Sequence, residues 1–124
     1  MTPYATAHTA AYRQQAVLSA TPGRLVVMLY DGALRFLFQA AAAMREGATA
    51  QADDRIGRAE AIVNELMVTL DMSQGEIPSR LQGIYVFCNR QMVEAKIERN
   101  ADKLDTTHAL LSELREAWAE IAGA

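Results

Sequence analysis

The stretch TPGRLVVMLYDGALRFLFQAAAAM, at residues 21–44, constrains the fold most, because as a helix it is apolar around most of its circumference. Thr21 is a favourable N-cap, Pro22 suits the first helical position, and Gly47 is a plausible stop. At about 100° per residue, the polar side chains form one narrow stripe of Arg24, Asp31, Arg35 and Gln39. An ordinary surface helix needs an apolar arc of only roughly 100°. This helix is therefore either the central helix of a bundle or a bundle helix that also presents an apolar face to a partner.

Two apolar ridges follow from the same helical spacing. The first contains Leu25, Leu29, Gly32, Phe36, Ala40 and Ala43. The second contains Val27, Tyr30, Leu34, Leu37, Phe38 and Ala41. Because one ridge suffices to pack a helix on a bundle, the second can contact a partner, and Val27, Tyr30 and Leu34 are candidate partner-binding residues. On the polar stripe, Asp31 and Arg35 are expected to form an ion pair one turn apart.

Three further helices are predicted over residues 51–70, 76–98 and 101–121, since apolar residues recur there at three- and four-residue spacing. Short connections force consecutive helices to run antiparallel. The predicted fold is all-α: an antiparallel up-down-up-down four-helix bundle at residues 21–124, preceded by a mobile N-terminal arm with a short helical segment at residues 1–20. The expected core seams are Ile56, Ala59, Val63, Leu66 and Leu70; then Ile77, Leu81, Ile84, Tyr85, Cys88, Met92 and Ala95; and finally Leu104, Thr107, Leu111, Leu114, Trp118 and Ile121.

The third predicted helix carries apolar residues on a second side. Val86, Val93 and Ile97 lie about 150° from its core seam, and a contact between two helices cannot bury both sets. Surplus apolar surface usually marks a partner site, so these three are also candidate partner-binding residues. Irregular packing or a homodimer would cover the same surface.

Composition and charge argue against several kinds of partner. The chain has 124 residues, 51% of them apolar, which suits one domain with its own core. Its net charge of −3 offers no electrostatic footprint for nucleic acid or an anionic membrane. The single cysteine, Cys88, excludes an internal disulfide and suits a reducing cytosol. The sequence shows no secretory leader pattern and no uncharged apolar run of roughly 18 residues, so we expect a cytoplasmic protein without membrane insertion.

No catalytic or metal-binding pattern stands out. A carboxylate-bridged metal bundle needs two Glu-x-x-His motifs, whereas only Asp105 and His108 have a similar spacing here. The sequence contains no Gly-rich phosphate loop and no Gly-x-Ser-x-Gly or Cys-x-x-Cys motif. We therefore expect no enzymatic activity, no metal and no cofactor. One alternative is a histidine-phosphotransfer bundle, although His108 lacks the Lys-Gly that usually follows; another is an inert homodimerising bundle.

Several of these segments resemble the FliS family of flagellin export chaperones. The resemblance rests on Ala11-Tyr12, residues 25–37 (LVVMLYDGALRFL), residues 70–77 (LDMSQGEI), Leu81-x-x-Ile84-Tyr85 and residues 110–118 (LLSELREAW). Their order and spacing also match, and the resemblance covers essentially the whole chain.

The resemblance implies a cytosolic, ATP-independent chaperone with a helical-bundle fold. Its client would be the disordered C-terminal segment of flagellin, with one monomer binding one flagellin. The chaperone would prevent premature polymerisation and deliver flagellin to a component of the flagellar type III export gate. The client would place apolar anchors in a groove. The arm that carries Tyr12 resembles an element that covers part of this surface when no client is bound, so Tyr12 is a candidate partner-binding residue, either as a cover or as a direct contact.

Overall fold

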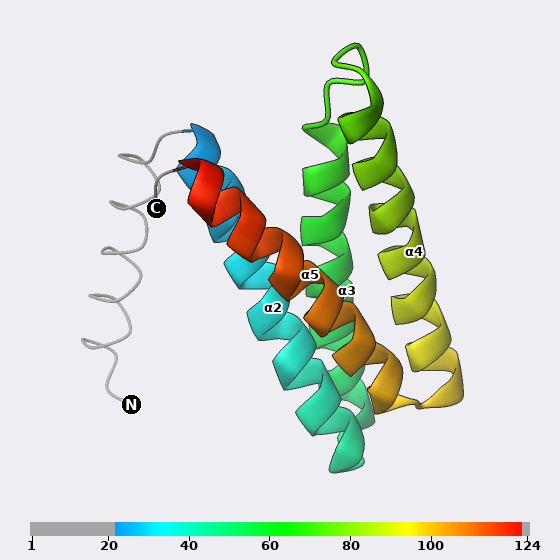
Figure 1. Ribbon diagram of the computed structural model, residues 1–124. Helices are drawn as coiled ribbons and strands as arrows, with labels where there is room; N and C mark the ends of the chain where they lie inside the picture. The colour runs from blue at the N-terminus through cyan, green and yellow to red at the C-terminus, as the bar shows by residue number, and fades with distance from the viewer. Residues whose placement is uncertain (1–21, 123–124) are drawn as a thin grey trace, which may run out of the picture.

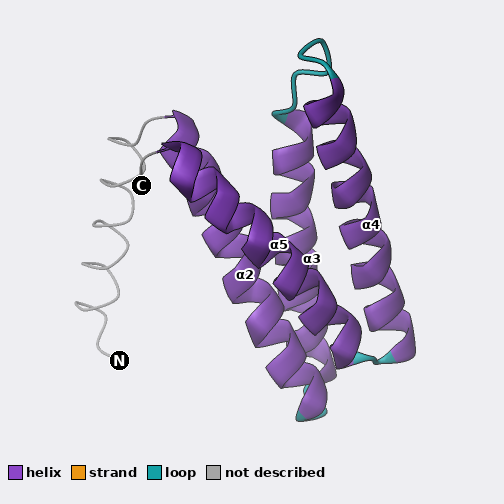
Figure 2. Cartoon of the chain, viewed as in Figure 1, coloured by secondary structure: helices purple, strands orange, loops and turns teal. Residues whose placement is uncertain are grey.

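The computed structural model describes residues 22–122, and four helices account for most of them. They are α2 (Pro22–Arg45), α3 (Thr49–Val68), α4 (Glu76–Glu98) and α5 (Ala101–Ala122). Between residues 22 and 122 there is no strand, and the predicted all-α fold is confirmed (Figure 2). The predicted N-terminal arm, with Tyr12, and the expected N-cap Thr21 lie outside the described residues.

The four helices form a ring in which each packs against its neighbours in the sequence and α5 returns to pack against α2. Figure 1 shows α2 beside α5 and α3 beside α4, with short connections between consecutive helices. The predicted up-down-up-down bundle is therefore confirmed. The contacts of α2 with α3 and α5 are more extensive than those of α4 with its two neighbours. The most apolar helix is thus the central one, and α4 is the most peripheral.

The bundle is tight at one end and splayed at the other. At the tight end small side chains are buried, which lets the helices approach closely: Ala40, Ala41 and Ala43 in α2, Ala52 in α3, Ala95 in α4 and Ala101 in α5. At the other end, which carries the α3–α4 loop, α2 and α5 lean away from α3 and α4 (Figure 1). Helices α2 and α4 begin at the splayed end, and α3 and α5 end there. All four helices therefore contribute residues to this end.

The predicted core seams are confirmed where the helices lie close together. The fully buried residues from these seams include Ile56, Val63, Tyr85, Cys88, Met92, Leu104, Thr107 and Leu111. The prediction is wrong for Ile77 and Ile121, whose side chains are 71% and 78% exposed. Both residues lie at the splayed end, where the helices have separated and a regular apolar spacing no longer meets a neighbour.

Two turns depend on glycines with positive φ. Gly75 precedes α4 with φ 89°, a conformation that side chains with a Cβ rarely adopt, and no side-chain hydrogen bond caps this helix. Asp71 organises the preceding loop instead: its Oδ1 accepts from the Ser73 backbone N–H at 3.1 Å and from the Ser73 hydroxyl at 2.6 Å. Gly47, with φ 75°, follows α2 as predicted.

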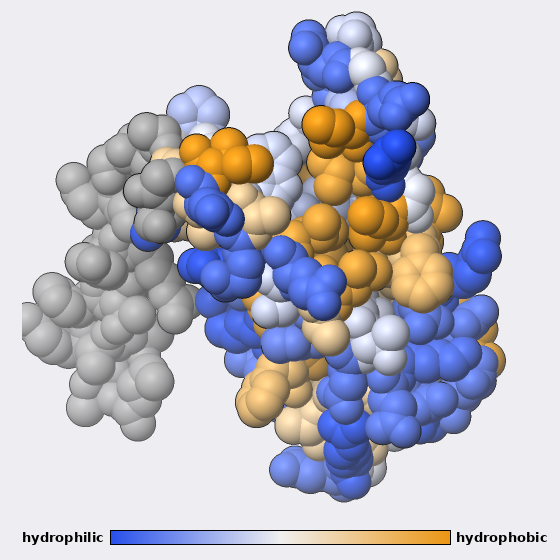
Figure 3. Space-filling model, in the orientation of Figure 1, coloured by the Kyte–Doolittle hydropathy of each residue, from blue (hydrophilic) through white to orange (hydrophobic). Residues whose placement is uncertain are grey.

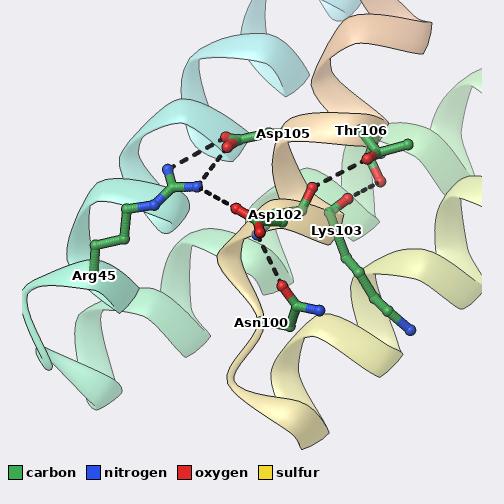
Figure 4. A network of polar contacts seen from close by, with 7 residues as sticks. Arg45, Asn100, Asp102, Lys103, Asp105 and Thr106 are labelled. Atoms are coloured by element: carbon green, nitrogen blue, oxygen red, sulfur yellow. Dashed lines mark hydrogen bonds and ion pairs between the residues drawn. The ribbon is translucent and has the colours of Figure 1, made fainter.

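A polar network connects α2 to α5 at the tight end (Figure 4). The Arg45 guanidinium donates to Asp102 Oδ1 at 3.0 Å and to Asp105 Oδ2 at 2.5 Å. Asn100 Oδ1 accepts from the Asp102 backbone N–H at 3.1 Å and caps the start of α5. Exposed ion pairs contribute only about 0–1 kcal/mol each. The network therefore orients the end of α2 against the start of α5 more than it stabilises the fold.

The expected ion pair between Asp31 and Arg35 is replaced by one between helices. Asp31 Oδ1 accepts from Arg115 Nε on α5 at 2.9 Å. The guanidinium of Arg35 instead lies 5.2 Å from the centroid of the Phe36 ring. The reason is that α5 packs directly alongside α2, which brings Arg115 within reach of the polar stripe.

Candidate partner-binding cleft

An apolar cleft of about 580 Å³ opens at the splayed end of the bundle. Its walls are Pro22, Leu25, Val26 and Leu29 of α2; Glu65, Leu66, Thr69, Leu70, Asp71 and Gln74 of α3 and the following loop; Ile77, Pro78, Leu81 and Tyr85 of α4; and Trp118 of α5. Figure 3 shows apolar surface gathered in the hollow between α5 and α4. Most lining side chains are aliphatic or aromatic, so the cleft suits several apolar side chains of a partner.

A second hollow, the α2–α3 groove, continues from the cleft. It encloses about 500 Å³ and is lined by Leu25, Met28, Leu29, Asp31, Gly32, Arg35 and Glu65. The cleft and the groove share Leu25, Leu29 and Glu65, so they adjoin along the first turns of α2. At Gly32 the two helices approach closely, because an added Cβ would lie 3.1 Å from Ile62 Cδ1.

Two buried tyrosines pair beneath the cleft, and one of them, Tyr85, lines it. The hydroxyls of Tyr30 on α2 and Tyr85 on α4 lie 2.5 Å apart and share a hydrogen bond. Tyr30 is 0% exposed and Tyr85 is 1% exposed. Burial raises the pKa of both phenols, and the pKa of Tyr30 is raised further by the Tyr85 hydroxyl. The pair connects two diagonally opposed helices just below the point where the bundle opens.

Tyr30→Phe is expected to lower the free energy of unfolding by about 1–3 kcal/mol, because it leaves the Tyr85 hydroxyl buried without its partner. The double variant Tyr30→Phe/Tyr85→Phe should lose less than the sum of the two single variants. Urea unfolding of the four proteins at pH 7.5 measures this coupling. If the loss in the double variant equals the sum of the two single losses, the two hydroxyls do not interact in the folded protein.

The same pair predicts sensitivity to alkali. A phenol whose folded pKa lies above its unfolded value of about 10 stabilises the fold fully below that pH and loses this contribution as pH rises. Repeating the unfolding experiment at about pH 10.5 should therefore narrow the stability difference between the wild type and the double variant. A constant difference would show that neither phenol has a raised pKa.

The three residues expected on the outer side of α4 are exposed in the structure. The side chains of Val86, Val93 and Ile97 are 46%, 44% and 75% exposed, and we name them the α4 outer face. The α4 residues that line the cleft include Ile77 and Leu81, which lie closer to the start of the helix and on a different side of it from Val86. The chain thus carries two separate apolar surfaces.

The expectation for α2 is partly wrong. Val27 and Tyr30 are both 0% exposed, so these side chains are core and not a free surface. The reason is that α2 packs against α3 on one side and α5 on the other, and the second apolar ridge is used by this additional neighbour. Leu34 is half-buried against the core, while Phe38, on the same ridge, is 69% exposed. Tyr12 lies outside the described residues.

Sequence reasoning missed most of the residues that line the cleft. Leu25 and Leu29 belong to the first apolar ridge of α2, and Ile77, Leu81 and Trp118 were assigned to core seams. Helical spacing identifies which residues share a face, but it does not show where two helices diverge along that face. The one available signal was the surplus of apolar residues around the circumference of α2.

Within residues 22–122, the cysteine, histidine and carboxylate side chains form no arrangement typical of a catalytic or metal site. Cys88 is 0% exposed, and burial raises the pKa of its thiol to about 11, so it is neither a nucleophile nor a metal ligand at neutral pH. No group of three or more His, Cys, Asp or Glu residues in this part of the chain is placed to hold a metal ion. His108, the alternative phosphotransfer residue, is half-buried on α5.

Among the described helices, α2 alone is long and apolar enough to cross a membrane. The same criterion is met by central helices of globular proteins, and 39% of the most apolar window of α2 is buried within the bundle. The packing of α2 between α3 and α5 accounts for its apolar composition without a membrane.

A family model and several individual relatives point to the same protein family. The sequence model of the family described as flagellar protein FliS matches residues 4–124. The flagellar secretion chaperone FliS of Bacillus subtilis is 31% identical over 110 residues, which cover 89% of this chain and 82% of the relative. The same-named protein of Campylobacter jejuni is 34% identical over 112 residues, covering 90% and 88%. That of Escherichia coli is 31% identical over 123 residues, covering 94% and 90%.

Proposed function

This chain belongs to the FliS family of flagellar secretion chaperones, and we propose that its client is the disordered C-terminal segment of flagellin. In this proposal one monomer holds one flagellin, prevents premature polymerisation without ATP, and delivers it to a component of the flagellar type III export gate. The protein acts in the cytoplasm by binding alone, without a cofactor, catalysis or contact with nucleic acid.

The observation that carries this proposal is the open apolar cleft and its continuation into the α2–α3 groove. A disordered segment that folds on binding loses conformational entropy, so it needs a large apolar contact to reach useful affinity. An amphipathic segment meets this need by placing apolar residues of one face into a groove between helices. The cleft and the groove, joined through Leu25 and Leu29, provide such a continuous path.

The α4 outer face fits the same proposal as a second contact. A long client can occupy the cleft with one part and reach Val86, Val93 and Ile97 with another. Val93→Asp is then expected to weaken flagellin binding while leaving helical content and the melting midpoint nearly unchanged, because Val93 is 44% exposed and packs outside the core. Unfolding of this variant, or unchanged affinity, would remove the α4 outer face from the proposal.

Light scattering with flagellin from the same bacterium tests the proposal. We expect the chaperone to form a 1:1 complex with full-length flagellin and with flagellin truncated at its N-terminus. Flagellin truncated at its C-terminus should not bind. Equal binding of both truncated forms would contradict the assignment of the client segment.

The same samples test the alternatives. A stable homodimer that flagellin does not dissociate would favour a bundle that covers its apolar surface with a second copy. Transfer of phosphate from a phosphodonor to His108 would favour the phosphotransfer function.

A further inference from the structure

The charged residues that line the cleft are all of one sign. Among the described residues that line it, Glu65 and Asp71 are the only ionisable groups besides Tyr85, and none is a lysine or an arginine. Both carboxylates come from the same side of the cleft, the end of α3 and the loop that follows. The apolar cleft therefore has one acidic wall.

Neither carboxylate is neutralised by a cation in the described part of the chain. Asp71 Oδ1 and Oδ2 accept hydrogen bonds from Ser73 and Gln74, which carry no charge. These bonds lower the pKa of Asp71, so it is ionised at neutral pH. Glu65 is exposed and has no salt bridge within residues 22–122. Their negative charge is thus available to a bound partner.

Glu65 also occupies a special position, because it lines both the cleft and the α2–α3 groove. A segment that occupies both hollows would therefore lie close to it, as well as to Leu25 and Leu29. The cation in the groove, Arg35, lies over the Phe36 ring and forms no salt bridge with Glu65. A carboxylate next to apolar walls favours a partner that carries a positive charge beside its apolar anchors.

We propose that the cleft selects and orients its client by charge: the bound segment is amphipathic and places a lysine or arginine against Glu65 and Asp71. This inference rests on the proposed function and specifies the chemistry of the client. The apolar anchors supply most of the affinity, and the basic residue fixes the register of the segment across the cleft, because a shift would place an apolar residue against the carboxylates. The attraction between exposed charges is modest and falls with salt.

The test is a charge-reversal experiment with the C-terminal segment of flagellin as the probe. Glu65→Arg should weaken its binding about five- to tenfold at 50 mM salt, mostly through slower association, and less at 500 mM salt. Glu113→Arg is the matched control: Glu113 is exposed on α5, lines neither hollow, and the substitution changes the net charge equally. Its affinity should stay within about twofold of the wild type.

The reciprocal change identifies the client residue. Each lysine and arginine of the flagellin segment is replaced in turn by glutamate and titrated against both the wild type and Glu65→Arg. One client variant should bind the wild type more weakly and Glu65→Arg more strongly than the unchanged segment does. Equal effects of Glu65→Arg and Glu113→Arg, or the absence of any such compensating client residue, would overturn the inference while leaving flagellin binding intact. A segment that does not bind the wild type would instead contradict the proposed function.

Discussion

Replacing Ile77 by aspartate is expected to weaken binding of the flagellin C-terminal segment at least about tenfold without destabilising the bundle. Ile77 lines the cleft and is 71% exposed, so it is available to a client but contributes little to the core. Burying such a side chain is worth about 1.5–3 kcal/mol, and about 1.4 kcal/mol corresponds to tenfold in affinity. Calorimetric titration measures the loss.

The fold should tolerate this substitution. Ile77 lies in the first turn of α4, where a carboxylate interacts favourably with the helix dipole. Phe38→Asp is the matched control, because Phe38 is similarly exposed at 69% but lines neither the cleft nor the α2–α3 groove. An equal loss of affinity in both variants, or none in Ile77→Asp, would show that the client binds elsewhere.

Leu111→Ala is expected to lower the free energy of unfolding by about 2–5 kcal/mol, because Leu111 is 0% exposed and its truncation leaves a cavity in the core. Ile121→Ala should cost less than about 0.5 kcal/mol, since Ile121 on the same helix is 78% exposed. Urea unfolding followed by circular dichroism measures both losses. Similar losses at the two positions would mean that α5 is packed along its whole length and that the splayed end closes in solution.

The contrast between Leu111 and Ile121 also shows what the sequence can and cannot predict. Both positions follow the same three- and four-residue spacing, and the periodicity that correctly predicted all four helices treats them alike. The separation of α2 and α5 from α3 and α4 depends on the packing of all four helices together. Small residues such as Ala40 and Ala95 draw the helices together at one end, and no local pattern marks where that approach stops.

The candidate site was predicted in part for a related reason. Helical spacing placed Val93 and Ile97 on the side of α4 away from its core seam. They are exposed because α4 makes the fewest contacts and keeps that side free. For α2 the sequence showed two apolar ridges but not how many neighbours the helix has. Since α2 has two well-packed neighbours, Val27 and Tyr30 are core residues, and the part of α2 that lines the cleft is near the start of the helix.

The intrinsic fluorescence of Trp118 tests the central claim, that the client occupies the cleft. Trp118 is the only tryptophan in the chain, it lines the cleft, and it is only partly buried, so its emission reports on this site alone. Titration with a tryptophan-free flagellin C-terminal segment should shift the emission to shorter wavelength and saturate at one segment per chaperone. An unchanged spectrum, while light scattering shows that the 1:1 complex has formed, would place the client outside the cleft and contradict the claim.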